Sequence, residues 1–279
     1  MTDQTTTILV GDRNVLSTAA PPSTAERRIE LVFRSDHAGP ERIAAAVGAT
    51  GPQAVIVFAP KPGEGEAIAT SGIPAAAWLI PPSPRLELQP ELSPFKLIVA
   101  TDLDTAEGAG AKSWTQMARP VSDALFVDDP NFEFITRAFF DGSTSERRDR
   151  FLQPVKHRFD VLHLVDGSSQ VQLSELLGRC QVAINLHSEP GLPSRDRVGP
   201  ALAAGLLVLA ERPLERPDLV EGEHLVGFTS PFELEELIAS SIENPEHFSE
   251  IRKAGHAAAE LRRSSTAIEL VTDHLIAQV

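Results

Sequence analysis

The stretch that decides the fold is Gln181 to Arg212, QVAINLHSEPGLPSRDRVGPALAAGLLVLAER. Apolar runs at 182–186 and 206–210 have the length and composition of buried strands. Between them, the Gly, Pro and Ser residues of 188–194 predict a loop, and a short helix of small residues follows and ends at Gly205. A strand that enters a helix through such a loop brings backbone N–H groups and the positive end of the helix to one point. The stretch therefore predicts a site for a phosphate-bearing ligand.

Charged side chains stand where this helix is expected to begin. Arg195 and Arg197 could each hold a phosphate group with two parallel hydrogen bonds. The alternative is that they form surface ion pairs with Glu189 or Asp196, and the sequence does not decide between the two.

The end of the first strand carries a second pair of polar residues, Asn185 and His187. Ligands of open α/β sheets bind at the carboxyl ends of the strands, which is where these residues would lie. His187 could hydrogen-bond a phosphate or a sugar hydroxyl, and a purely structural histidine is the equal alternative.

Composition limits the class of protein. The 279 residues suffice for one large domain or two ordinary ones, and the formal charge of −14 argues against nucleic acid as a partner. A single cysteine, Cys180, excludes an internal disulfide framework and favours a reducing compartment, where we expect it to be a buried thiol and not a nucleophile. The chain does not open on a secretory signal and has no apolar run of about 20 residues, so we expect a cytoplasmic protein without a membrane span.

The same cycle of strand and crossover runs along both halves of the chain. Strands are expected at 6–10, 29–33, 54–59, 75–80, 95–100, 124–127, 132–140, 161–165, 182–186, 206–210 and 225–228. Helices are expected from Gly39-Pro40 to Gly48 or Gly51, then at 143–159 and 171–180, from Ser230-Pro231 onward, and at 245–263 and 264–277. Such alternation is typical of parallel, doubly wound sheets. We therefore predict two Rossmann-like α/β domains facing a cleft, 1–130 and 131–279, divided at the acidic Asp128-Asp129-Pro130.

Two motifs of the first half suggest chemistry that we do not expect. The segment 108–113 resembles a phosphate-binding loop, but alanine occupies both positions that need glycine, and an ordinary loop is the better interpretation. Asp102 and Asp104 have the Asp-x-Asp spacing that can hold a divalent metal, but the pattern is short and common in loops. We expect no metal site.

His37 is the candidate catalytic residue of the first half. Asp36 and His37 follow the second expected strand, where a histidine could act as a general base. The alternative, which we favour, is that Asp36 caps the next helix and His37 is exposed.

The second half resembles a known family. The resemblance lies in FEFITR at 132–137, SERRDRFL at 145–152, FDVLHL at 159–164, SELLGRCQVAINLH at 174–187, RVGPALAAG at 197–205 and several shorter segments up to about residue 265. These segments are similar to the C-terminal domain of group 1 glycosyltransferases with the GT-B fold, and more specifically to the CgeB-like, spore-maturation type.

The resemblance implies a hexosyltransferase that takes its sugar from a nucleotide-diphosphate donor. The donor would bind mainly to the C-terminal domain and the acceptor to the N-terminal one. Arg137 or Arg147, together with the segment 188–197, would hold the diphosphate, and Asn185 and His187 would line the donor pocket. Arginines and helix N–H groups can stabilise a leaving diphosphate without a metal or any other cofactor.

One departure from the family weakens this implication. The family usually has a glutamate on the donor ribose five residues before the glycine that ends the small helix, and Pro200 stands there, preceded by Gly199. Losing such a contact costs about 1–3 kcal/mol. Glu189 or Asp196 could substitute. The main alternative is a catalytically silent relative that binds a glycan or stabilises a protein partner, and a sugar-nucleotide epimerase on the same fold is a third possibility.

Overall fold

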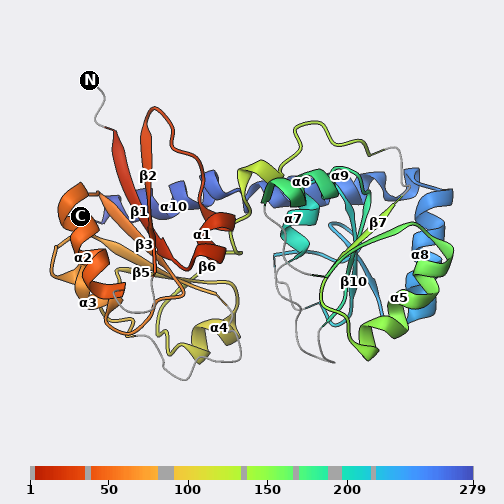
Figure 1. Ribbon diagram of the computed structural model, residues 1–279, viewed down its shortest axis with the longest axis horizontal. Coiled ribbons are helices and arrows are strands. Elements are labelled where there is room, and N and C mark those ends of the chain that lie inside the picture. Colours follow the sequence, from red (N-terminus) through yellow and green to blue (C-terminus); the bar gives the residue numbers. More distant parts are fainter. Residues whose placement is uncertain are drawn as a thin grey trace. The chain divides into compact units, whose positions relative to one another are not determined.

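The computed structural model describes residues 4–34, 39–80, 91–132, 137–165, 170–187, 197–214 and 218–278. The chain forms two compact units, shown in Figure 1. Unit 1 contains Met1–Ser122 and Ser264–Val279, and unit 2 contains Asp123–Arg263. The second unit thus begins a few residues before the boundary expected after residue 130, and the last sixteen residues belong with the first unit.

Unit 1 is built on a parallel sheet in the order β2-β1-β3-β4-β5-β6. Its strands are β1 (Thr5–Gly11), β2 (Arg27–Phe33), β3 (Ala54–Phe58), β4 (Ala75–Leu79), β5 (Leu97–Ala100) and β6 (Thr115–Gln116). Its helices are α1 (Arg13–Ala19), α2 (Gly39–Thr50), α3 (Glu64–Ala69), α4 (Leu103–Gly108) and α10 (Ser264–Ala277). Every residue of β3 and β4 is buried, as expected for central strands covered on both faces.

Helix α10 supplies part of the core of unit 1. Its apolar side chains Ala267, Ile268, Val271 and Leu275 are buried in one cluster with side chains of β1, β3 and β4. A buried pair of hydroxyls, Thr7 of β1 and Thr272 of α10, lies 3.3 Å apart. The end of the chain therefore returns to complete the first unit.

Unit 2 has a parallel sheet of its own, in the order β11-β10-β9-β7-β8. Its strands are β7 (Ala138–Asp141), β8 (Val161–Leu164), β9 (Val182–Asn185), β10 (Leu207–Glu211) and β11 (Val226–Phe228). Its helices are the 3-10 turn η1 (Asp123–Leu125), α5 (Glu146–Arg158), α6 (Gln170–Leu177), α7 (Val198–Ala203), α8 (Pro231–Glu243) and α9 (Glu246–Glu260). Helix α5 packs with α8, and α7 packs with α9.

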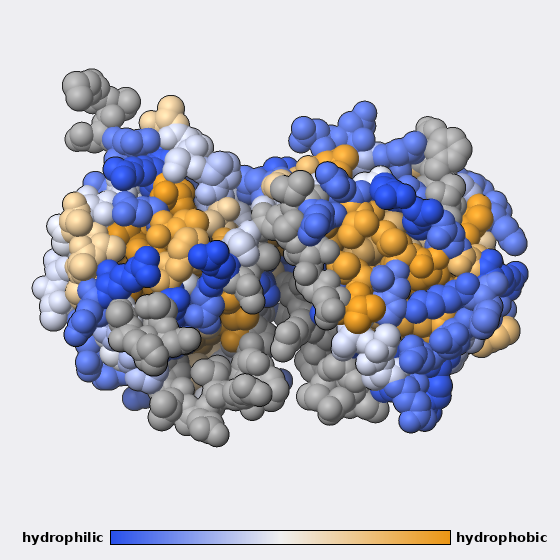
Figure 2. All heavy atoms as spheres, viewed as in Figure 1, coloured by the Kyte–Doolittle hydropathy of each residue, from blue (hydrophilic) through white to orange (hydrophobic). Residues whose placement is uncertain are grey.

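The core of unit 2 joins the sheet to helices α5 and α8. Leu152 and Val155 of α5 and Leu234 and Ile238 of α8 are buried against strands β7, β9 and β10. Hydrophilic residues cover the region over α5 in Figure 2, which agrees with the charged run that opens this helix. Within the described part of the chain, no helix is long and apolar enough to cross a membrane.

The prediction of a strand at 124–127 is wrong. The structure has the turn η1 there, with Leu125 buried and the ring of Phe126 lying 3.9 Å from the guanidinium carbon of Arg263. Four apolar residues are long enough for a strand, but here they form a turn, and the Phe126 ring packs against Arg263, just beyond the end of α9. Helices α1, α3 and α4 and the short strand β6 were not expected from the sequence.

Candidate functional site

The carboxyl edge of the unit 2 sheet gathers charged side chains. Because all five strands are parallel, their carboxyl ends meet at one edge. Strand β7 ends in Asp141, β9 ends in Asn185 and β10 ends in Glu211. This edge is where the sequence places the candidate site.

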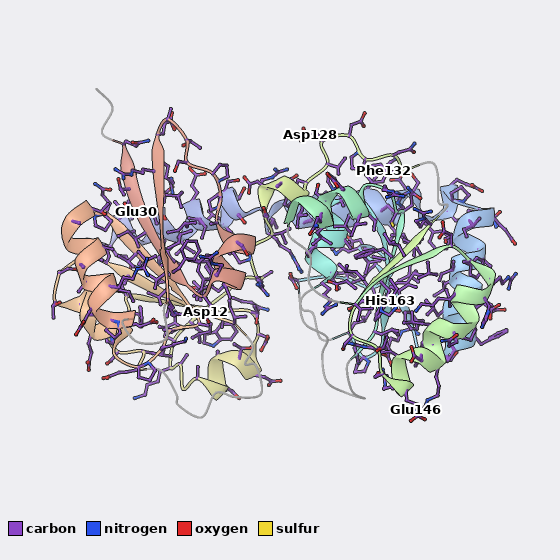
Figure 3. The ribbon with its side chains drawn as sticks, viewed as in Figure 1. Asp12, Glu30, Asp128, Phe132, Glu146 and His163 are labelled. Atoms are coloured by element: carbon purple, nitrogen blue, oxygen red, sulfur yellow. The ribbon has the colours of Figure 1, made fainter. Side chains whose placement is uncertain are left out.

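Helix α5 adds two arginines to this edge. Ser145 caps the helix, because its side-chain oxygen accepts a hydrogen bond from the backbone N–H of Arg148 at 3.2 Å. The cap places Arg147 and Arg148 in the first turn, at the positive end of the helix. Figure 3 labels Glu146 at the start of α5.

Arg147 bridges two strand ends. Its Nη2 donates to Oε1 of Glu211, and its Nη1 donates to the carbonyl of His187 at 3.1 Å. The other oxygen of Glu211 accepts the backbone N–H of His187 at 3.0 Å. The guanidinium of Arg147 also lies over the ring of Phe151, 5.5 Å from the centroid. The side chain keeps 20% of its surface exposed and can still be reached by a ligand.

Arg148 is buried and holds the backbone around the site. It donates to the carbonyls of Leu186 and His187, each at 3.3 Å, and to the carbonyl and hydroxyl of Ser143 at 3.0 and 3.1 Å. Burial lowers the pKa of Arg148, and the nearby charges of Arg197 and Arg147 lower it further. The arginine thus carries its charge among other cations.

Arg197 reaches the same edge from the residue before α7. Its Nη1 lies 2.6 Å from Oδ1 of Asp141, but this buried nitrogen makes no well-directed hydrogen bond to any residue that the structure describes. Burial raises the pKa of Asp141, and the charges of Arg197, His163 and Arg148 oppose that rise. The pair of Asp141 and Arg197 is therefore close but poorly aligned.

His163 of β8 completes the polar edge, and Figure 3 labels it. Its two ring nitrogens lie 2.8 Å from the Nζ of Lys156 and 2.8 Å from the carbonyl of Gly142. A lysine can only donate, so we assign Nδ1 as the acceptor and Nε2–H as the donor. The ring thus joins the side chain of Lys156 on α5 to the backbone that follows β7.

A shallow cavity of about 290 Å³ adjoins these residues. It is lined by Arg147, Arg150, Phe151 and Pro231, which come from the first two turns of α5 and the first residue of α8. Its lining combines the apolar Phe151 and Pro231 with two arginines, so the cavity can take a flat or partly apolar group of a charged ligand.

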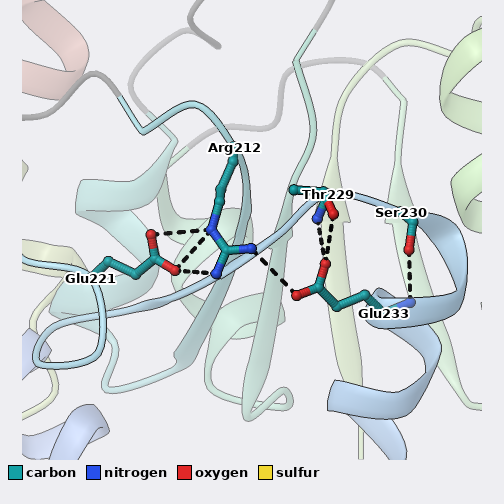
Figure 4. A network of polar contacts seen from close by, with 5 residues as sticks. All are labelled: Arg212, Glu221, Thr229, Ser230 and Glu233. Carbon is teal, nitrogen blue, oxygen red and sulfur yellow. Dashed lines mark hydrogen bonds and ion pairs between the residues drawn. The ribbon is translucent and has the colours of Figure 1, made fainter.

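Arg212, which follows β10, belongs to a separate network shown in Figure 4. Its Nε donates to Glu221 at 2.9 Å and its Nη1 donates to Glu233 at 3.3 Å. Glu233 also accepts the backbone N–H of Thr229 at 2.7 Å, and Ser230 caps α8. These contacts commit Arg212 to joining the loop after β10 to the start of α8.

The structure brings together only part of the expected donor site. Arg147, Arg197, Asn185 and His187 lie at the carboxyl edge, but Arg137 does not. Arg137 precedes β7, at the amino edge of the sheet, where it forms an ion pair of 2.6 Å with Asp160. Of the two arginines proposed for the diphosphate, the geometry favours Arg147.

The remaining expected residues divide into two groups. His37, Glu189 and Arg195 lie outside the described residues, as do Asp36 and Asp196. Asp102, the first residue of the Asp-x-Asp motif, caps α4 by accepting the backbone N–H of Thr105 at 2.7 Å. No group of three or more metal-ligating side chains occurs within the described ranges.

Cys180 is buried, as expected from the sequence. Burial raises the pKa of its thiol to about 11, so a thiolate is rare near neutral pH. The thiol is therefore a packing residue.

The sequence interpretation missed Asp141, Arg148 and Glu211. A signal for both acids was available, because each is the one charged residue at the end of an apolar strand, in AFFD and LVLAE. A charge at the end of a buried strand is unusual unless it is paired or functional. Arg148 carried no such signal, since it lies in a run of charged residues.

Comparisons with known proteins agree with this architecture. Residues 147–268 match the model of a family described as glycosyl transferase-like. No curated protein matches the sequence. Among solved structures, Anabaena Alr3699/HepE in complex with UDP is similar, with a TM-score of 0.58, 12% identity, and 98% of this chain and 99% of that chain covered.

Two further structures are similar over their whole length. A glycosyltransferase from Rickettsia africae has a TM-score of 0.63 and 10% identity, with 98% of this chain and 99% of that chain covered. Sucrose-phosphate synthase from Thermosynechococcus elongatus has a TM-score of 0.60 and 9% identity, with 99% of each chain covered. The chain therefore has the GT-B fold of two Rossmann-like domains, and its residues 147–268 resemble the glycosyl transferase-like family.

Proposed function

We propose that this protein is a glycosyltransferase that moves a sugar from a nucleotide-diphosphate donor to an acceptor, without a metal. The donor diphosphate binds at the carboxyl edge of the unit 2 sheet, and unit 1 serves the acceptor. The family match over 147–268, which includes most of this edge, supports the proposal.

One observation carries the proposal. Three arginines, Arg147, Arg148 and Arg197, meet at the edge, and among the residues that the structure describes two carboxylates, Asp141 and Glu211, are paired with them there. The net positive charge lies beside the first turn of α5, whose dipole favours an anion. A diphosphate leaving group gains negative charge during sugar transfer, and fixed guanidinium groups stabilise that charge.

The similar structures suggest the identity of the nucleotide. Complexes of Anabaena Alr3699/HepE contain UDP, UDP with glucose, and UDP-glucose. We propose a uridine diphosphate sugar as the donor. The CgeB-like subtype and a cytoplasmic location, which the single cysteine favours, belong to the same proposal.

A second candidate function rests on α7. The residue expected to hold the donor ribose is Pro200, in the first turn of α7 and preceded by the buried Gly199. Neither residue can accept hydrogen bonds from two hydroxyls through a side chain. The second candidate is a catalytically silent relative that binds a nucleotide, a glycan or a protein partner and transfers no sugar.

A thermal-shift screen against UDP, GDP, TDP, CMP and their sugars tests these functions, because a ligand that binds only the folded protein raises its melting temperature. We expect a shift with UDP or UDP-glucose and a loss of affinity of about tenfold in Arg197→Ala, which removes a charged donor from the diphosphate. Arg158→Ala is the matched control. Arg158 is the last residue of α5, far along the helix from Arg147, and it pairs with Glu235 of α8.

The outcomes separate the two candidates. No shift with any nucleotide at millimolar concentration contradicts the transferase. A shift without detectable donor hydrolysis or transfer to any acceptor supports the silent relative.

A further inference from the structure

Glu211 is the last residue of a strand that is otherwise apolar. All five residues of β10, LVLAE, are buried, and Glu211 as a whole is 5% exposed. Burying a carboxylate is costly unless charges and hydrogen bonds surround it. The contacts of the Glu211 carboxylate therefore indicate what this residue does.

Both oxygens of this carboxylate are already used. One accepts from Nη2 of Arg147, and the other accepts the backbone N–H of His187. A carboxylate that is held on both oxygens and is only 5% exposed is poorly placed to accept the hydroxyls of a ribose. Glu211 is therefore not a replacement for the glutamate missing at Pro200.

The contacts form a closed ring. Glu211 holds the N–H of His187 and the guanidinium of Arg147, and the same guanidinium holds the carbonyl of His187 at 3.1 Å. The ring joins the ends of β9 and β10 to the first turn of α5. Within the described part of the chain these contacts use two of the five N–H donors of Arg147, and the others are left for a ligand.

We propose that Glu211 is a positioning residue for donor binding, which orients Arg147 toward the diphosphate and fixes His187 at the end of β9. This inference rests on the proposed function. A guanidinium oriented in advance loses less freedom when it binds phosphate, so the carboxylate raises donor affinity without touching the donor. A purely structural ion pair would affect folding alone.

Nucleotide affinity in Glu211→Gln tests the proposal, with UDP as the probe and calorimetry as the measurement. Glutamine keeps the size but can accept only through one atom, so either Arg147 or His187 loses its partner. We expect UDP binding to weaken by about tenfold at a temperature where the variant is folded. Glu233→Gln is the matched control, because Glu233 lies in the neighbouring network of Arg212 and we expect its UDP affinity to be unchanged.

A double-mutant cycle with Arg147→Lys separates positioning from a structural effect. Lysine keeps the charge but cannot hold Glu211 and the carbonyl of His187 with a fixed fork. If Glu211 acts through Arg147, the double variant binds UDP no more weakly than the weaker single variant, and simple multiplication of the two losses overturns the proposal. Should Glu211→Gln fail to fold, Glu211→Asp takes its place, because aspartate keeps the charge but is one methylene too short to hold both Arg147 and His187. An affinity loss of about tenfold then supports positioning, and unchanged affinity overturns it.

The result for the unaltered protein keeps this test apart from the proposed function. If the unaltered protein does not bind UDP, the uridine-nucleotide donor fails and this inference fails with it. If it binds UDP and Glu211→Gln binds UDP equally well, only the role of Glu211 is overturned.

Discussion

Each unit of this protein has an arginine–glutamate pair at the carboxyl edge of its sheet, and the two pairs differ in what surrounds them. In unit 1, Arg34 follows β2 and donates to Glu64 of α3 through Nε at 2.6 Å and Nη2 at 2.9 Å. In unit 2, Glu211 of β10 pairs with Arg147 of α5. Both pairs join a strand end to the first turn of a helix.

The pair of unit 1 is closed. The side chains of Arg34 and Glu64 are 3% and 1% exposed, and the surrounding charges of Asp12 and Lys61 cancel. Arg34 also donates to the carbonyl of Phe58 at 2.6 Å, and Glu64 accepts the backbone N–H of Lys61 at 2.8 Å. These contacts use the pair to hold the ends of β2 and β3 to α3.

The pair of unit 2 is open on the arginine side. Arg147 is 20% exposed while Glu211 is 6% exposed, and Arg148 and Arg197 add positive charge. The comparison teaches that the ion pair itself does not mark a binding site. We propose that exposure of the cation and an excess of like charge around it mark one.

The largest expected effect comes from breaking the closed pair. Glu64→Gln leaves the buried charge of Arg34 without its carboxylate, which should lower the free energy of unfolding of unit 1 by about 3–5 kcal/mol. Tryptophan fluorescence measures this selectively during urea unfolding, because both tryptophans, Trp78 and Trp114, lie in unit 1 and the chain has no tyrosine.

The same variant should leave the open pair intact. We expect UDP affinity of folded Glu64→Gln to equal that of the unaltered protein. A clear loss of affinity would show that the closed pair also serves the ligand, and the contrast between the two edges would be wrong.

The next effect concerns the helix caps. Ser145→Ala removes the cap of α5 and Asp102→Ala removes the cap of α4, and each should cost about 1 kcal/mol of stability. Only Ser145→Ala should also weaken UDP binding, by about two- to fivefold, because Arg147 and Arg148 stand in the first turn that it orders. Urea unfolding measures the stability of both variants, and calorimetry measures their affinity for UDP. An equal loss of UDP affinity in Ser145→Ala and Asp102→Ala would contradict the prediction.

The smallest expected effect sharpens the charge argument. Asp141→Asn removes the carboxylate beside Arg197 and should raise the affinity for UDP-glucose by about two- to fivefold, the strength of a partly exposed ion pair.

The pH dependence should follow the same direction. Because burial raises the pKa of Asp141 above its ordinary value of 3.8, the folded protein takes up this proton at a higher pH than the unfolded chain. Affinity should therefore rise as the pH falls toward the pKa of Asp141, and Asp141→Asn should abolish that rise. If the affinity of Asp141→Asn still rises as the pH falls, another titrating group causes the rise.

Local pattern was enough to predict most of the elements. The apolar runs of β3, β4, β9 and β10 and the start of α8 at Ser230-Pro231 were all read from neighbouring residues. Parallel pairing followed from their alternation with helices. Because all strands of a parallel sheet run in the same direction, the sequence also predicted Asn185 and His187 at a carboxyl edge.

The site itself depended on contacts that are distant in the chain. Glu211 and Arg147 are 64 residues apart, and they meet because α5 packs across strands that are not neighbours in sequence. Arg137 shows the converse, since its place one residue before β7 puts it at the amino edge. Proximity along the chain to a strand does not say which end of the strand a side chain serves.

Two properties of this protein thus have different origins. The kinds of elements and the α/β class were determined by the sequence alone, because the periodicity of apolar residues and the helix caps act over a few residues. The division into units, with α10 returning to the first, and the cluster of arginines at the edge of unit 2 were decided only by the tertiary structure. The reason is that strand order and long-range packing determine which distant charges share one low-dielectric edge.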